Sequence, residues 1–127
     1  MSAVDHGESK EGIRAAKKFA AFAAKFAKTL PPGRGFLADR LQESANSIPL
    51  CVAEGAENPS LADGIRQYSI ARRAAKNCSA ILDLCGQEGL IGEERYRAGR
   101  RLLAHVTQCL SDWEARSRRL PRPSRSA

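Results

Sequence analysis

The chain has 127 residues, 43% of them hydrophobic, and this length bounds it to one domain with an ordinary buried core. No apolar run approaches the roughly 20 residues that span a bilayer, and the N-terminal residues lack the pattern of a signal peptide, so we expect a cytoplasmic protein. The net charge of +7 favours acidic partners, above all nucleic acid.

The first predicted helix covers residues 9–30, after residues 1–8, which we expect to be disordered. On a helical wheel of about 100° per residue, Phe19, Phe22 and Phe26 lie on one side. The opposite side is a stripe of positive charge, and its members are Lys10, Arg14, Lys17, Lys18, Lys25 and Lys28. The prolines and glycines of residues 31–35 end this helix.

The second predicted helix covers residues 36–57 and contains a proline. Its apolar residues, among them Leu41 and Ile48, follow spacings of three and four. Pro49 removes the hydrogen-bond partner of the Ala45 carbonyl and crowds that turn, which costs about 3 kcal/mol in a helix interior. We expect a kink at Pro49, after which the helix resumes.

The third predicted helix covers residues 61–85, with Ser60 as its N-cap. Its apolar arc contains Ile70, Ala74, Cys78, Ile81, Leu82 and Cys85. This arc covers about 160° of the wheel, which is wider than one neighbouring helix needs and leaves surface for a second copy of the chain. The polar side carries Arg66, Arg72, Arg73 and Lys76.

The fourth predicted helix covers residues 93–116 and starts with two glutamates, which suit the positive end of the helix dipole. Its apolar stripe includes Leu103, Val106 and Leu110. The arginines that point away from the stripe are Arg97, Arg100 and Arg101. Residues 120–127 contain prolines and arginines without an apolar pattern, so we expect a disordered basic tail.

No segment alternates with the period of two that is typical of strands. Each of the four helices has one apolar stripe to bury, and the connections between them are short. The sequence therefore predicts an all-α fold, an up-down-up-down antiparallel four-helix bundle over residues 9–119.

The four cysteines form no CxxC pair and stand among apolar neighbours. In a protein that is not secreted, such residues are typically reduced, buried thiols. Their spacing and the presence of only two histidines predict no metal site, and we expect no cofactor.

Residues 44–60, SANSIPLCVAEGAENPS, resemble the SIPxNIAEG stretch of a bacterial family of four-helix-bundle proteins. That family includes proteins encoded in intervening sequences of 23S rRNA genes and the accessory variability protein of diversity-generating retroelements. The matching residues are Ser47, Ile48, Pro49, Ala53, Glu54 and Gly55. The likeness covers roughly residues 34–120, with Cys51 in place of the family's asparagine and Asn77 where a glutamate is frequent.

The resemblance carries expectations about assembly and partners. Known members of the family look like homopentameric rings with a basic surface, so it implies a homo-oligomer, and the number five comes from the resemblance alone. It also implies that the six motif residues are structural or interface residues, and that a reverse transcriptase is a candidate partner.

The sequence shows no convergent set of acid, base and nucleophile groups and no phosphate-binding glycine loop, so we predict that the protein is not an enzyme. We expect His105 to be a packed or interfacial histidine. We expect Glu54 to be a structural acid bonded to a neighbouring helix or subunit.

Two interpretations of the basic surface stay open. In the first, the clustered cations hold RNA, DNA or a hybrid by counterion release, with little regard for base sequence. In the second, the protein is an assembly scaffold that docks an acidic protein without binding nucleic acid. A binding titration against salt distinguishes the two.

Overall fold

The computed structural model describes residues 6–58 and 61–118, so the predicted disorder of residues 1–5 and 120–127 lies outside the described residues. The described residues form four α-helices and one short 3-10 helix, with no strand among them. In chain order these elements are α1 (His6–Ala27), η1 (Pro32–Arg34), α2 (Gly35–Glu57), α3 (Ala62–Gln87) and α4 (Glu93–Arg118). The predicted all-α fold is confirmed.

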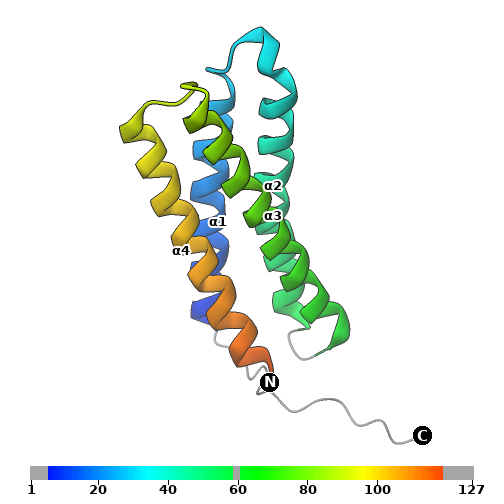
Figure 1. Ribbon diagram of the computed structural model, residues 1–127. Coiled ribbons are helices and arrows are strands. Elements are labelled where there is room, and N and C mark those ends of the chain that lie inside the picture. Colours follow the sequence, from blue (N-terminus) through cyan, green and yellow to red (C-terminus); the bar gives the residue numbers. More distant parts are fainter. Residues whose placement is uncertain (1–5, 59–60, 119–127) are drawn as a thin grey trace, which may run out of the picture.

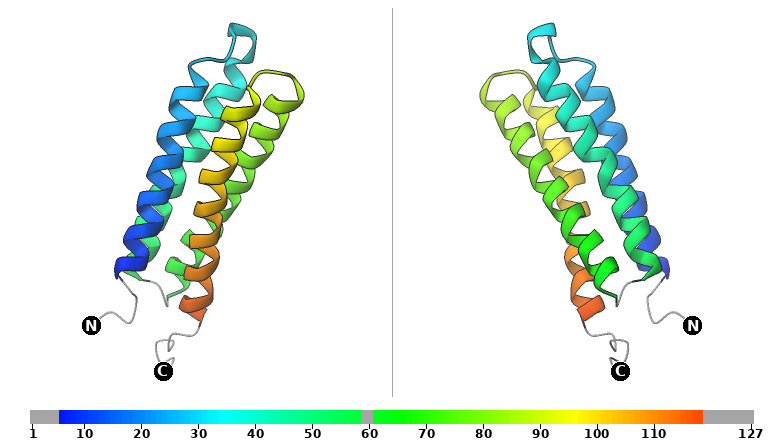
Figure 2. Two further views of the ribbon diagram at one scale, coloured as in Figure 1. Left: turned by 90° about the vertical axis from the view of Figure 1, so that its left-hand side faces the viewer. Right: turned by 90° about the vertical axis from the view of Figure 1, so that its right-hand side faces the viewer.

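Successive helices run in opposite directions, which gives the predicted up-down-up-down bundle (Figure 1). α1 packs against α2 and α4, and α3 packs against the same two helices from the other side (Figure 2). Over the described ranges no Cα atom of α1 lies within 8 Å of one in α3, and none of α2 lies within 8 Å of one in α4. Each of these pairs therefore occupies a diagonal of the bundle, and the outer faces of α1 and α3 point in opposite directions.

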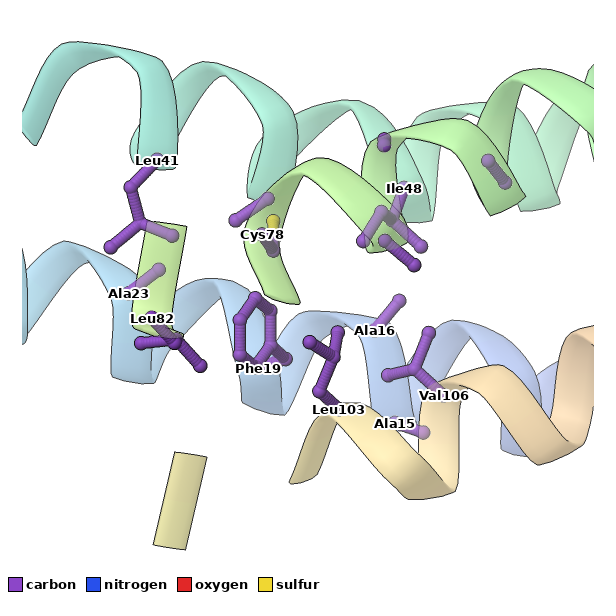
Figure 3. Packing of buried hydrophobic residues seen from close by; sticks show 14 of the residues in the cluster. Ala15, Ala16, Phe19, Ala23, Leu41, Ile48, Cys78, Leu82, Leu103 and Val106 are labelled. Atoms are coloured by element: carbon purple, nitrogen blue, oxygen red, sulfur yellow. The ribbon is translucent and has the colours of Figure 1, made fainter. Parts of the chain in front are cut away.

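The core is built from the apolar stripes that the helical wheel identified. Phe19, Ile48 and Leu82 are fully buried, and Figure 3 shows them in the interior with residues from all four helices. α1 adds fully buried alanines, Ala16 and Ala23, whose small side chains let the neighbouring helices approach closely.

Ile70 is an exception to the predicted apolar stripes, because its side chain is 38% exposed. Leu84 of the same helix is 44% exposed. α2 and α4 cover the centre of the wide apolar arc of α3, and residues at or beyond the edge of that arc stay in contact with solvent.

α2 continues through Pro49 as one helix, so the prediction that the helix resumes after the proline is confirmed. The Ser47 hydroxyl donates a 2.9 Å hydrogen bond to the carbonyl of Ser44, not to that of Ala45, whose usual partner the proline removes. The size of the bend at Pro49 stays a prediction.

The connection between α2 and α3 depends on two glycines. A Cβ atom at Gly64 would lie 1.8 Å from the carbonyl oxygen of Asn58, and one at Gly55 would lie 2.6 Å from the Tyr68 ring. The Tyr68 hydroxyl donates a 3.2 Å hydrogen bond to the carbonyl of Gly55. The motif glycine therefore lets the Tyr68 side chain of α3 lie directly against the backbone of α2.

The helix ends differ from the sequence predictions at two places. α1 begins at His6, so residues 6–8, for which the sequence predicts disorder, are helical; no proline stands there to prevent it. Leu61 occupies the N-cap position of α3 without a side-chain cap, and the predicted cap, Ser60, lies outside the described residues. None of the helices described is long and apolar enough to cross a bilayer.

Candidate nucleic-acid interface

Six cations form what we call the α1 cationic face: Lys10, Arg14, Lys17, Lys18, Lys25 and Lys28. All six side chains are exposed, as predicted, and none forms an ion pair with another side chain of residues 10–58 and 61–118. About 27 Å of helix separates the first from the last. This length corresponds to about eight phosphates along one strand of B-DNA.

A second basic region is a groove of about 410 Å³ between α3 and α4, which we call the α3–α4 groove. Its polar lining consists of Arg72, Lys76, Ser79, Arg100, Thr107, Gln108 and Ser111. A hollow of about 330 Å³ adjoins it on α3 and is lined by Ser69, Arg72, Arg73 and Lys76. Guanidinium, ammonium and hydroxyl donors of this kind can bind a phosphate oxygen.

Internal contacts already hold the two arginines that line the groove from opposite helices. Arg72 forms a short ion pair with Glu114, which is 8% exposed and also accepts a 2.8 Å hydrogen bond from Arg118. Because these contacts offset much of its charge, Arg72 is a weaker phosphate ligand than an unpaired cation.

Arg100 is held in the same way. It donates to the Ser79 hydroxyl, lies 3.7 Å from an Asp83 carboxylate oxygen and covers the Tyr96 ring at 5.9 Å. The Tyr96 hydroxyl donates a 2.6 Å hydrogen bond to Asp83, and this bond is the main cause of a raised pKa of Tyr96. Lys76 is left as the cation of the groove with no such partner among the described residues.

The remaining predicted cations do not join these regions into one surface. Arg66, Arg73 and Arg101 are exposed, and Arg97 pairs with Glu93 at 2.6 Å on the surface of α4. Because α1 and α3 lie on a diagonal, the α1 cationic face and the α3–α4 groove face different directions. The thirteen predicted residues are thus exposed or half-buried, but they are divided between separate sides of the bundle.

Sequence reasoning missed the polar lining of the groove. Thr107 and Ser111 stand one turn apart beside the buried stripe of α4, and this spacing was visible in the sequence. The sequence could not reveal that Ser79 of α3 lies across from them.

The six motif residues are divided between the interior and the surface of α2. Ile48 and Gly55 are buried, Ser47 and Pro49 are half-buried, and Ala53 and Glu54 are exposed. No ion pair joins Glu54 to another helix in the part of the chain described, and its pairing with a second copy stays a prediction. Burial raises the pKa of the neighbouring Cys51, and the charge of Glu54 adds to this effect.

The four cysteines are reduced, but only two of them are buried. Cys78 and Cys85 lie in the core, and burial raises the pKa of Cys78 to about 12. Cys51 and Cys109 are half-buried. The prediction of buried thiols is confirmed for the first pair and wrong for the second, because Cys51 and Cys109 stand at the edges of their apolar stripes.

The structure defines a class, the antiparallel four-helix bundles, and here the outside of one helix carries exposed cations without an ion pair in the part of the chain described. A sequence model of the 23S rRNA-intervening sequence protein family matches residues 8–112. The chain therefore belongs to that family, as the motif in α2 indicated. No curated protein is similar enough to the chain to count as a match.

Proposed function

We propose that the protein is a non-catalytic accessory protein that associates with RNA, DNA or a hybrid through the α1 cationic face, as a homo-oligomer in the cytoplasm. The observation that carries the proposal is the row of six exposed cations without an ion pair in the described residues. The family is not a known enzyme family, which agrees with a binding role.

The electrostatics favour phosphate recognition over base recognition. Since no carboxylate of residues 10–58 and 61–118 pairs with the six cations, each can displace a counterion from a nucleic-acid backbone, and this gain in binding free energy falls with rising salt. Base recognition in single strands relies on exposed rings. Phe36 is 70% exposed with Arg40 over its ring at 5.7 Å, but this ring belongs to α2 and not to the α1 cationic face.

Two features support self-association through α2 and α3. Phe36 and Leu50 on α2 are 70% and 69% exposed, and Ile70 and Leu84 on α3 add apolar surface. The outer side of α2 carries four acids, Asp39, Glu43, Glu54 and Glu57, so this side does not compete with the α1 cationic face for phosphates. A second copy of the chain can thus pack against α2 and α3 while the α1 cationic face stays open to nucleic acid. The resemblance adds the pentamer and a reverse transcriptase partner to this proposal.

A mobility-shift titration against salt tests nucleic-acid binding. The triple variant Lys17→Ala, Lys18→Ala, Lys25→Ala should weaken binding to RNA and to DNA alike. It should also reduce the slope of log affinity against log salt by about 0.9 for each duplex phosphate that the variant no longer neutralises. The matched control, Arg66→Ala, Arg73→Ala, Arg97→Ala, removes the same charge from α3 and α4 and should weaken binding less.

Three outcomes would count against the proposal. A larger loss in the control would move the interface to α3 and α4. Equal losses of affinity in the α1 variant and the control would mean that net charge alone determines binding. No binding of either nucleic acid at low salt would favour the alternative, a scaffold that docks an acidic protein.

A further inference from the structure

Three side chains with metal-binding chemistry meet at the outer seam between α1 and α4. The Glu11 Oε2 atom and the His105 Nε2 atom are 3.0 Å apart. One carboxylate oxygen, one imidazole nitrogen and the Cys109 sulfur all lie within 4.8 Å of one another. The first two side chains are exposed and the third is half-buried, so an ion in solution can reach them. The two helices lie side by side along this seam (Figure 2).

The backbone places these groups without strain. His105 and Cys109 are four residues apart on α4, so their side chains project from the same face on successive turns. α1 is close at this level, because a Cβ atom built on Gly12 would lie 3.8 Å from the Cβ atom of Cys109. Glu11, the neighbour of Gly12, is thereby brought to the imidazole from the opposite side of the seam.

The three side chains offer more ligand atoms than an ion pair between Glu11 and His105 would need. The Glu11–His105 contact needs only two groups, and the Cys109 sulfur adds a third ligand atom beside it. Thiolate, imidazole and carboxylate together are ligands of Zn²⁺, at about 2.3, 2.0 and 2.1 Å respectively. In a tetrahedral site such ligand atoms lie about 3.3 to 3.6 Å apart, as these bond lengths require. The three atoms here lie within 4.8 Å of one another, so the side chains must adjust to close on an ion.

We propose that Glu11, His105 and Cys109 bind a Zn²⁺ ion, with water as the fourth ligand. The thiolate selects against Mg²⁺ and Ca²⁺, which prefer oxygen ligands. The ion joins the first helix of the bundle to the last, two segments that are 94 residues apart at the Glu11–His105 contact. Zinc therefore stabilises the folded chain, since the ligands come together only in the native state. The sequence-based expectation of no metal site rested on the cysteine spacing and on the presence of only two histidines, and the proposal departs from it because the fold brings Glu11 to His105 and Cys109.

Co²⁺ titration of the metal-stripped full chain tests the site, because a cobalt–thiolate bond gives a charge-transfer band and a tetrahedral cobalt ion gives strong visible bands. The expected result is one Co²⁺ bound per chain and displaced by Zn²⁺. Cys109→Ser should abolish the charge-transfer band, whereas Cys51→Ser, which changes the other half-buried thiol, should keep it. His105→Ala and Glu11→Gln should each weaken Zn²⁺ binding by about tenfold or more.

Zn²⁺ should also raise the melting temperature of the wild type and of Cys51→Ser, but not that of Cys109→Ser. Circular dichroism of each variant checks folding, and none of the substituted side chains is fully buried. The proposal is overturned if the band is absent from the wild type, if it survives in Cys109→Ser, or if His105→Ala and Glu11→Gln bind Zn²⁺ as tightly as the wild type.

Discussion

Gly55 shows why a single position of the α2 motif is restricted to glycine. A methyl group there would lie 2.6 and 3.0 Å from two carbon atoms of the Tyr68 ring, which is itself fully buried. Gly55→Ala should therefore lower the free energy of unfolding by about 1 to 3 kcal/mol, as overpacking does in other cores. Chemical denaturation measures this loss.

Gly35→Ala is the matched control for that substitution. A Cβ atom at Gly35 meets nothing within 4 Å, and the backbone there is right-handed helical with φ of −58°. The same substitution should leave stability unchanged or raise it by about 0.4 to 1 kcal/mol, because alanine restricts the unfolded chain. Equal losses at Gly35 and Gly55 would contradict the role assigned to the Tyr68 contact.

Because of Tyr68, the free energy of unfolding also depends on pH in the alkaline range. Burial raises the pKa of its hydroxyl from 10.0 to about 12, and the hydrogen bond from Ser117 opposes that shift in part. Because the folded chain holds the proton more tightly than the unfolded chain, this contribution is complete below pH 10 and is lost as the pH rises toward about 12. Unfolding measured across this range should show a smaller decline for Tyr68→Phe than for the wild type.

A remaining decline in Tyr68→Phe is expected from Cys78, whose pKa burial raises from 9.0 to about 12. Parallel declines in the two proteins would mean that Tyr68 does not titrate differently on folding. At neutral pH, Tyr68→Phe should cost about 1 kcal/mol, because the hydrogen bonds of the hydroxyl are removed.

At the scale of the helices, Glu114 of α4 forms ion pairs with Arg72 of α3 and with Arg118 in the last turn of α4. It accepts hydrogen bonds from Arg72 and Arg118, and its own side chain is 11% exposed. Glu114→Gln should lower the free energy of unfolding by about 1 kcal/mol or somewhat more, since charge-assisted bonds are removed. The arginines are 43% and 66% exposed, so water compensates them and limits the loss.

Glu93→Gln provides the comparison for Glu114. Glu93 pairs with Arg97 one turn away, and both side chains are largely exposed, at 76% and 69%. Removal of this ion pair should lower the free energy of unfolding by only about 0.3 to 0.5 kcal/mol. A cost at Glu93 as large as the cost at Glu114 would show that burial does not distinguish the two pairs.

The helices themselves were predictable because the apolar side of each helix must be buried against the other helices. The pattern around Phe19 and Val106 marks the buried faces of α1 and α4, and both residues are in the core. Contacts between helices were not predictable in the same way. A wheel shows which face of α3 carries Arg72, but not that Glu114, 42 residues away, lies opposite. The exposure of Ile70 has the same origin, because it depends on which neighbours cover α3.

For the whole molecule, the sequence predicted which cations are exposed but not how they are distributed in space. The cations of the α1 cationic face lie on one side of the bundle, whereas those of α3 and α4 partly pair with acids such as Asp83 and Glu114. The diagonal placement of α1 and α3 follows from three-dimensional packing, which the wheel of a single helix does not contain. This placement is why the two basic regions can be tested separately.

The proposed self-association belongs to this scale as well, and Leu50 is its most direct test. Leu50 is 69% exposed on the acidic outer side of α2, near Glu54 in the chain, so a charge there does not disturb the core. If a second copy covers this side, Leu50→Glu must bury a carboxylate without a partner, and the assembly should dissociate. Light scattering at micromolar concentration should then show an oligomer for the wild type and a monomer with unchanged circular dichroism for Leu50→Glu. Ala21→Glu, which places the same charge on the exposed side of α1, should stay oligomeric. A monomeric wild type, or an oligomer that persists in Leu50→Glu, would exclude α2 as the contact between copies.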